Sequence, residues 1–99
     1  MLKVDLHIHT AFSFDSSMSV ERVIERCLEV GINCLAVTDH NTITGAIKMR
    51  EIAPFPIIVG EEVLTTEGEI IGFFLTEEIP SGLPPKEVVS RIKSHGRLL

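Results

Sequence analysis

The sequence predicts an α/β fold in which parallel strands alternate with helices. Residues 2–9 alternate apolar and polar side chains, the period-two pattern of a half-buried strand. Residues 19–31 then carry apolar side chains at helical spacing and end at a glycine, and a second apolar run and helical pattern follow. Repeated strand–helix units of this length indicate parallel strands joined by right-handed crossovers.

The first helix has the clearest local signals. After a Ser- and Asp-rich loop over 11–17, Ser19 is placed to cap the helix and Gly31 to end it in a left-handed conformation. The expected apolar stripe comprises Val20, Val23, Ile24, Cys27 and Leu28.

The second unit begins with a short apolar strand over 34–38, followed by polar residues at 39–41 that a strand interior would reject. Thr42 or Thr44 opens the next helix, and Pro54 prevents it from continuing. The expected buried side chains of this helix are Ile43, Ala46, Ile47 and Ile52.

The remaining residues predict a third strand over 57–59, with Gly60, Glu61 and Glu62 at its end. A further apolar run over 69–75 is expected to pair with it as a hairpin. A turn over 81–85 leads into a helix that ends at Gly96. This helix is expected to bury Val88, Val89 and Ile92 and to carry Arg91, Lys93 and His95 near its carboxyl end.

Composition restricts the class of protein. Ninety-nine residues make one small domain, and a net charge of −5 argues against a basic nucleic-acid-binding face. Cys27 and Cys34 lack CxxC spacing and are expected to be buried free thiols. Charged Lys3 and Asp5 in the first apolar run fit neither a signal peptide nor a membrane span, so the cytoplasm is the expected location.

Two histidines one residue apart, His7 and His9, close the first strand. Because strand side chains alternate, both imidazoles point to the same side, where they can hold one metal ion or one each of a pair. Asp5 is expected on that face as an acceptor for a ligand's free ring N–H.

Further side chains that can bind a metal follow each predicted strand. Asp15 lies in the loop after the first strand, Asp39 and His40 follow the second, and Glu61 and Glu62 follow the third. Ligands of parallel α/β folds bind at the carboxyl ends of the strands, so these groups are expected to meet there. Imidazoles mixed with carboxylates suit Zn, Mn, Fe or Ni.

Three motifs resemble those of the PHP domain, the polymerase and histidinol phosphatase family of metal-dependent phosphoesterases. They are Asp5-Leu6-His7-Ile8-His9-Thr10, Thr38-Asp39-His40-Asn41 and Gly60-Glu61-Glu62. The resemblance implies a distorted (β/α)7, TIM-like barrel, of which residues 1–99 would form a truncated first part of three to four βα units. The family's later motifs, a His-Pro, a further histidine and an Asp-x-His, are absent from residues 1–99, so the 99-residue chain is expected to lack four of the family's ligands and could be inactive by itself.

The resemblance also implies a site and a reaction. The metal ligands would be His7, His9, Asp15, His40 and Glu62, with Glu61 only a nearby charge. Two or three divalent ions (Zn, Mn or Fe) would support hydrolysis of a phosphate ester in a small molecule or nucleotide. Four residues are expected to donate hydrogen bonds to phosphate oxygens or to orient ligands, namely Thr10, Ser13, Thr38 and Asn41, and Asp39 is expected to support a ligand or cap a helix.

The sequence is also compatible with two alternatives. Amidohydrolase barrels also carry His-x-His at the end of their first strand. A partial barrel that does no chemistry would expose strand edges and apolar surface, which favours self-association, so a homo-oligomer is expected.

Overall fold

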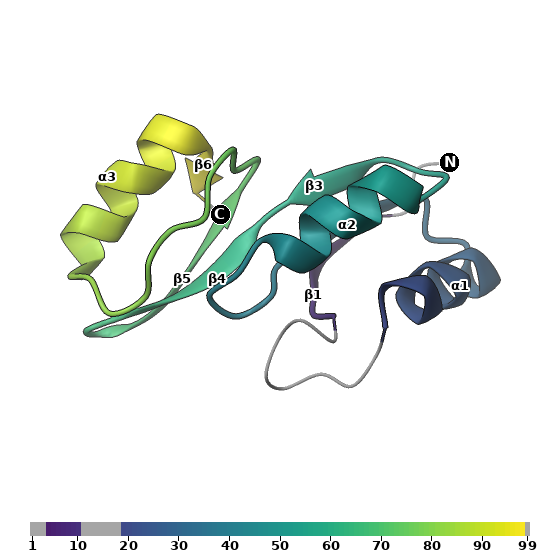
Figure 1. The fold of residues 1–99 in the computed structure, drawn as a ribbon, viewed down its shortest axis with the longest axis horizontal. Coiled ribbons are helices and arrows are strands. Elements are labelled where there is room, and N and C mark those ends of the chain that lie inside the picture. The colour runs from purple at the N-terminus through teal and green to yellow at the C-terminus, as the bar shows by residue number, and fades with distance from the viewer. Residues whose placement is uncertain (1–3, 11–18, 99) are drawn as a thin grey trace.

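The computed structural model describes residues 4–10 and 19–98, except for the side chains of His7, Arg97 and Leu98. In chain order, its elements are β1 (Val4–Ile8), α1 (Val20–Val30), β2 (Cys34–Val37), α2 (Thr44–Ile52), β3 (Ile57–Val59), β4 (Glu61–Thr65), β5 (Gly68–Phe73), α3 (Pro85–His95) and β6 (Arg97–Leu98). Figure 1 shows them arranged in an elongated molecule, with α3 and α1 at opposite ends.

The first half of the chain forms the predicted parallel sheet. β2 lies between β1 and β3, and both neighbours run parallel to it. The side chains of Leu35, Ala36 and Val37 in β2 are fully buried, as expected for a central strand covered on both faces. The predicted α/β class with parallel strands is therefore confirmed.

The pairing of β1 with β2 contains an irregularity that the sequence pattern does not predict. Val4 and Asp5 pair with Cys34 and Leu35, but Ile8 pairs with Val37, so β1 uses one more residue than β2 over this stretch. An extra residue of this kind interrupts the alternation of side chains between the two faces.

The described residues form a second sheet, of antiparallel strands in the order β4, β5, β6. The predicted direct pairing of the third strand with 69–75 is wrong, because β3 ends at Val59 and a separate strand, β4, pairs with β5. Gly60 lies at the junction between the sheets. A Cβ atom there would lie 2.9 Å from both the Gly72 carbonyl oxygen and the Thr38 methyl carbon, so only glycine allows this close approach.

Helix α1 follows its sequence signals at both ends. The Ser19 hydroxyl accepts a hydrogen bond from the Arg22 N–H, and Gly31 has the left-handed φ of 81°. Val20, Val23 and Cys27 are buried, but Leu28 is 58% exposed, so the buried stripe is narrower than predicted.

Helix α2 begins at Thr44, after Ile43, an apolar residue that cannot cap the helix with its own side chain. The helix buries Ala46 and Met49, whereas Ile52 is 50% exposed, so the prediction of a buried Ile52 was wrong. The Glu78 carboxylate, from the segment before α3, accepts a hydrogen bond of 3.0 Å from the Ile43 N–H. It therefore places negative charge at the amino end of α2, where the helix dipole favours it.

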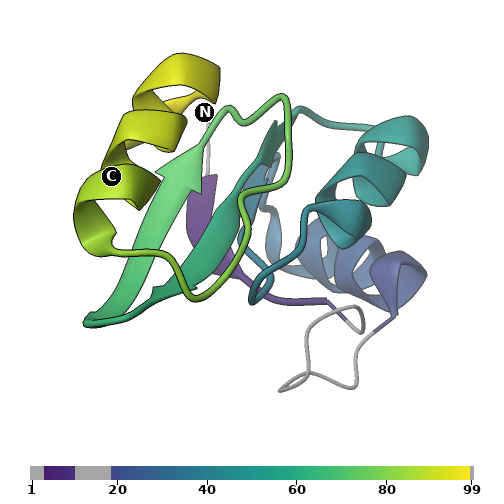
Figure 2. The ribbon, with the colours of Figure 1, turned by 60° about the vertical axis from the view of Figure 1, so that its left-hand side comes forward.

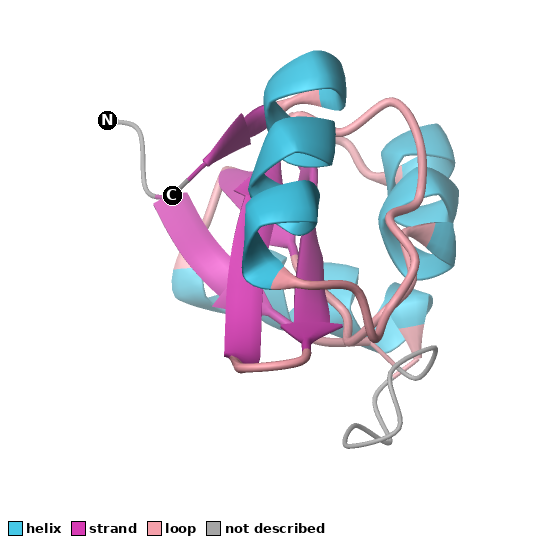
Figure 3. Ribbon diagram, turned by 90° about the vertical axis from the view of Figure 1, so that its left-hand side faces the viewer, coloured by secondary structure: helices cyan, strands magenta, loops and turns pink. Residues whose placement is uncertain are grey.

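Helix α3 covers the antiparallel sheet through Val88 and Ile92, both fully buried, and begins with proline in its first turn as predicted. Figure 2 shows α3 on the opposite side of the strands from α1 and α2. Figure 3 shows the same layering from the end nearest α3. One continuous core joins both sheets and all three helices, so the two sheets belong to one packing unit.

The cysteines are free, as expected, but only Cys27 is buried and Cys34 is half-buried. None of the helices in the described part of the chain has the length and apolar character needed to cross a membrane.

Glu61, expected to be no more than a nearby charge, is fully buried at the start of β4. Its Oε1 atom accepts a hydrogen bond of 2.8 Å from the Ile79 N–H, while Oε2 is buried without a hydrogen-bond partner in the described structure. Burial raises the pKa of the Glu61 carboxyl to about 7, and the neighbouring charge of Glu78 adds to this, although the Ile79 N–H opposes it.

We expect Glu78→Ala to lower the free energy of unfolding by about 1 kcal/mol, because it removes a cap and a favourable charge from the amino end of α2. Glu77→Ala is the matched control, since the Glu77 side chain is 68% exposed. Urea unfolding followed by circular dichroism measures both variants, and equal effects would contradict the capping role.

We expect Glu61 to make stability depend on pH. The folded state retains the Glu61 proton up to about pH 7, whereas the carboxyl of the unfolded chain loses it near the ordinary glutamate pKa of 4.5. The stability contribution of Glu61 is therefore fully present below pH 4.5 and is lost as pH rises through 7, by an amount of the order of 3 kcal/mol.

Glu61→Gln should abolish this pH dependence. Urea unfolding in EDTA at pH 5 and pH 8 should show that the variant gains stability relative to the wild type at the higher pH. Exposed Glu67 supplies the control, Glu67→Gln. If the free energies of unfolding of the wild type and Glu61→Gln differ by the same amount at pH 5 and pH 8, Glu61 is not a buried, protonated carboxyl.

Candidate metal centre

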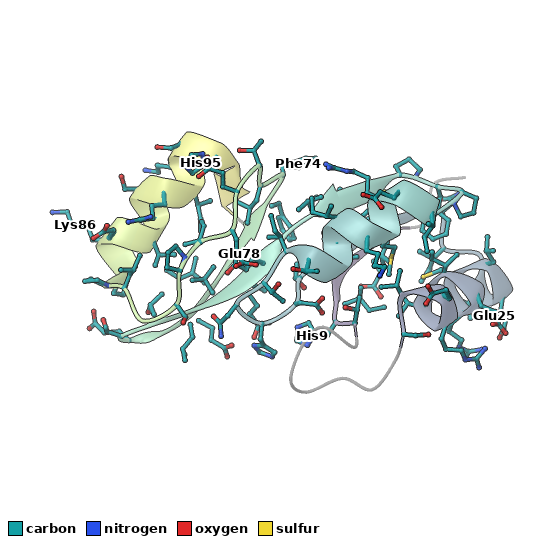
Figure 4. All side chains as sticks on the ribbon, in the orientation of Figure 1. His9, Glu25, Phe74, Glu78, Lys86 and His95 are labelled. Carbon is teal, nitrogen blue, oxygen red and sulfur yellow. The ribbon has the colours of Figure 1, made fainter. Side chains whose placement is uncertain are left out.

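Three sequence-predicted ligands gather where strands of the two sheets meet. His9 directly follows β1, His40 lies in the loop after β2, and Glu62 is the second residue of β4. Each residue offers a ligand atom, and these atoms all lie within 4.8 Å of one another. Figure 4 shows His9 at the lower edge of the molecule, at the end of β1.

Backbone pairing brings His40 to Glu62. The two residues form an isolated parallel bridge, in which the Glu62 N–H donates to the Asp39 carbonyl and the Asn41 N–H donates to the Glu62 carbonyl, each at 3.0 Å. The loop after β2 therefore extends the parallel pairing onto β4, although β2 itself pairs with β3.

The Glu62 carboxylate lies between the two imidazoles. Its Oε1 atom is 3.4 Å from His9 Nε2, and its Oε2 atom is 3.2 Å from His40 Nδ1. The two rings meet edge-on, with centroids 4.5 Å apart. The side chains of His9, His40 and Glu62 are 18%, 10% and 9% exposed, so the cluster is largely shielded from water while its donor atoms face one another.

This donor set fits a divalent cation. Imidazole nitrogens and carboxylate oxygens bind Zn, Mn or Fe at about 2.0–2.2 Å, so donors that share one ion lie roughly 2.9–3.6 Å apart. The two nitrogen–oxygen distances of the cluster fall within that range. A cation would also neutralise the buried carboxylate, which is otherwise costly to shield from water.

Thr10 and Asp39 join the strand ends that carry the two histidines. Both side chains are buried, and the backbone N–H and hydroxyl of Thr10 donate to the two carboxylate oxygens of Asp39, the second hydrogen bond at 2.6 Å. Thr10 therefore holds the Asp39 carboxylate, and its role in orienting ligands or contacting a phosphate stays a prediction.

Thr38 and Asn41 also have structural partners. Thr38 is fully buried, and its hydroxyl donates to the Ile8 carbonyl at 3.4 Å. Asn41 adopts a left-handed φ of 56°, and its side-chain oxygen accepts a hydrogen bond of 2.8 Å from the Leu64 N–H. Asn41 therefore anchors the loop after β2 to β4.

The structure places Asp5 beside α1. Asp5 lines a cavity of about 180 Å³ together with Ile8 and Cys27. Burial, and then the nearby Asp5 charge, raises the pKa of the Cys27 thiol. The interrupted alternation between Asp5 and Ile8 removes the reason to expect Asp5 on the face of His9. The side chain of His7, and Ser13 and Asp15, lie outside the described residues.

A further carboxylate beside His40, that of Glu69 in β5, was not predicted from the sequence. Its Oε2 atom is 2.9 Å from His40 Nδ1. A hydrogen bond with Glu62 raises the pKa of Glu69, with smaller contributions from burial and the Glu62 charge, and contacts with His40 oppose this. Glu62 pairs with Ile71 across the hairpin, and Glu69 lies two residues before Ile71, so both carboxylates share a face. Predicting Glu69 from the sequence would have required the correct pairing of 61–65 with 68–72.

Comparison with known proteins gives the same family as the motifs. The sequence matches the PHP domain family over residues 5–69. An uncharacterized protein of Methanocaldococcus jannaschii is 40% identical over 110 aligned residues, which cover 98% of this chain and 64% of that relative. The chain therefore spans less than two thirds of that relative's length.

Two solved structures resemble the fold. An amidohydrolase from Chromobacterium violaceum superposes with a TM-score of 0.66 at 26% identity, over 93% of this chain and 32% of the other. A candidate metal-dependent phosphoesterase from Bifidobacterium adolescentis superposes with a TM-score of 0.61 at 23% identity, over 94% of this chain and 32% of the other. Because the family match covers more than half of the sequence, the chain belongs to the PHP domain family.

Proposed function

We propose that this chain carries part of the metal centre of a hydrolase that cleaves phosphate esters. The observation that carries the proposal is the convergence of His9, His40 and Glu62 from three separate segments. The names of the two structural neighbours, an amidohydrolase and a candidate metal-dependent phosphoesterase, support metal-dependent hydrolysis.

The residues of the cluster would hold and orient the ion. Glu62 would supply negative charge between the two imidazoles, and the buried contact between Thr10 and Asp39 would keep the strand ends in place. A bound divalent ion supplies Lewis-acid chemistry, because it lowers the pKa of water and neutralises charge on phosphoryl oxygens. The three motifs contain no lysine or arginine, so a cation would have to supply the positive charge that a phosphate requires.

We further propose two or three ions of Zn, Mn or Fe, with His7 and Asp15 as additional ligands. The substrate would be a phosphorylated small molecule or nucleotide. The described strands would form the first part of a distorted (β/α)7 barrel, which the alignment with about a third of each structural neighbour supports.

An amidohydrolase is the second candidate function. The observation that favours it is the resemblance to the Chromobacterium violaceum protein, whose name assigns amide hydrolysis to that protein. Activity on a cyclic amide with no turnover of an aryl phosphate would favour this alternative.

Self-association also stays a proposal. Val4 and Leu6 are 43% and 49% exposed on β1, at the edge of the parallel sheet in the described structure. Apolar side chains on an edge strand favour pairing with another chain. Multi-angle light scattering of the purified protein tests this, since a monomer would contradict the proposed homo-oligomer.

We expect His40→Ala and Glu62→Ala to weaken Mn²⁺ or Zn²⁺ binding by at least about tenfold, because each removes a ligand. Isothermal titration calorimetry measures affinity, and turnover of p-nitrophenyl phosphate measures activity. His95→Ala is the control, because His95 lies on α3 and contacts Glu77 instead of the cluster. A wild-type protein that neither binds metal nor hydrolyses the ester would contradict the proposal.

We expect Thr10→Val to affect metal binding only indirectly, by removing a hydrogen bond that positions the neighbouring candidate ligands. Valine keeps the shape of the side chain but leaves the buried Asp39 carboxylate without its hydroxyl donor, so the free energy of unfolding should fall by about 2–3 kcal/mol. Metal affinity should also fall, because the ends of β1 and β2 lose a connection.

Thr66→Val is the matched control for this variant, because Thr66 is exposed in the β4–β5 turn. Denaturant unfolding and calorimetric titration of the folded variants separate the two effects. A destabilised Thr10→Val protein that binds metal as tightly as the wild type would show that Thr10 stabilises the fold without positioning the ligands.

A further inference from the structure

We propose that Glu69 is a metal ligand of the same centre, contributed by β5. This inference rests on the proposed metal site and extends it to a residue outside the three sequence motifs. It would give the β4–β5 hairpin two ligands, Glu62 and Glu69, in place of one.

Two carboxylates converge on one imidazole nitrogen. Glu69 Oε2 lies 2.9 Å and Glu62 Oε2 lies 3.2 Å from His40 Nδ1. A single N–H cannot be directed fully at both oxygens, whereas a cation bound to the nitrogen can accept both as ligands. The shorter of the two distances belongs to Glu69, so this residue is as well placed as the predicted ligand Glu62.

The hairpin register fixes this placement. Leu64 is the cross-strand partner of Glu69, and Glu62 precedes Leu64 by two residues, so Glu62 and Glu69 project from the same face of the hairpin. The Asn41 side chain holds the backbone of Leu64, which ties the loop carrying His40 to that part of the hairpin. The contact between Glu69 and His40 is therefore supported by ordered backbone on both sides.

The distances around His40 fit an ion shared with both carboxylates. Donors that bind one ion at about 2.0–2.2 Å lie roughly 2.9–3.6 Å apart. His40 Nδ1 lies 2.9 Å from Glu69 Oε2 and 3.2 Å from Glu62 Oε2, and both distances fall in that range, as does the 3.4 Å distance from His9 Nε2 to Glu62 Oε1. A cation would also remove the repulsion between the neighbouring carboxylates of Glu62 and Glu69.

Glu69 would differ from the other donors in its access to solvent. Its side chain is 42% exposed, whereas the side chains of His40 and Glu62 are 10% and 9% exposed. The experiment can therefore change Glu69 with little disturbance of the core. Glu67 offers a matched control on the same hairpin, because it is exposed and carries the same charge.

Co²⁺ binding to the full chain tests the inference by affinity and by visible absorption, which reports the ligands directly. Glu69→Gln should weaken Co²⁺ binding by about tenfold or more and change the d–d bands, because the amide is a poor ligand. Glu69→His should restore affinity with bands shifted by the new nitrogen ligand. Glu67→Gln should match the wild type in both measurements.

A hydrogen-bonding role without coordination predicts a different result, because the amide oxygen that Glu69→Gln introduces would still accept a hydrogen bond from His40. If Glu69→Gln binds Co²⁺ with wild-type affinity and spectrum, Glu69 is not a ligand, and the centre formed by His9, His40 and Glu62 stands. If the wild-type protein itself binds no Co²⁺, the proposed metal site fails, and the role of Glu69 fails with it.

Discussion

The pairing of the loop after β2 with the start of β4 organises the candidate centre. Glu62 exchanges backbone hydrogen bonds with Asp39 and Asn41, which flank His40. The Asp39 side chain in turn accepts two hydrogen bonds from Thr10, the residue after His9. Three segments that are distant in sequence are therefore held together by contacts next to the candidate ligands. These contacts, and not the imidazoles or the Glu62 carboxylate themselves, fix where the three side chains lie.

Close approach of the two sheets makes this arrangement possible. Gly60 allows the chain to leave the parallel sheet at Val59 and enter the antiparallel sheet at Glu61, in contact with Gly72 and Thr38. The next two glutamates then have different environments. Glu61 is buried and anchors the segment before α3 through Ile79, whereas Glu62 faces the two histidines. Strand alternation thus places a structural carboxyl and a candidate metal ligand in one dipeptide but on different faces.

The sequence predicts the features that depend on local pattern. The parallel strands, the ends of α1 and the choice of His9, His40 and Glu62 follow from periodicity, capping residues and motifs. Features that depend on register or tertiary contact are missed. The irregularity in β1 removes the argument for Asp5. Glu61 and Glu62 interrupt the apolar pattern, so β4, which begins with them, is not recognised as a strand, and β6 is too short to give a pattern. Burial of Glu61 and proximity of Glu69 to His40 arise only from packing and strand pairing.

The central claim is that His9, His40 and Glu62 bind one metal centre together. Anomalous scattering from crystals grown with Zn²⁺, recorded on both sides of the zinc absorption edge, tests it most directly. We expect an anomalous peak within bonding distance of both imidazoles and the Glu62 carboxylate. Anomalous peaks elsewhere on the protein, with none near these three side chains, would contradict this claim.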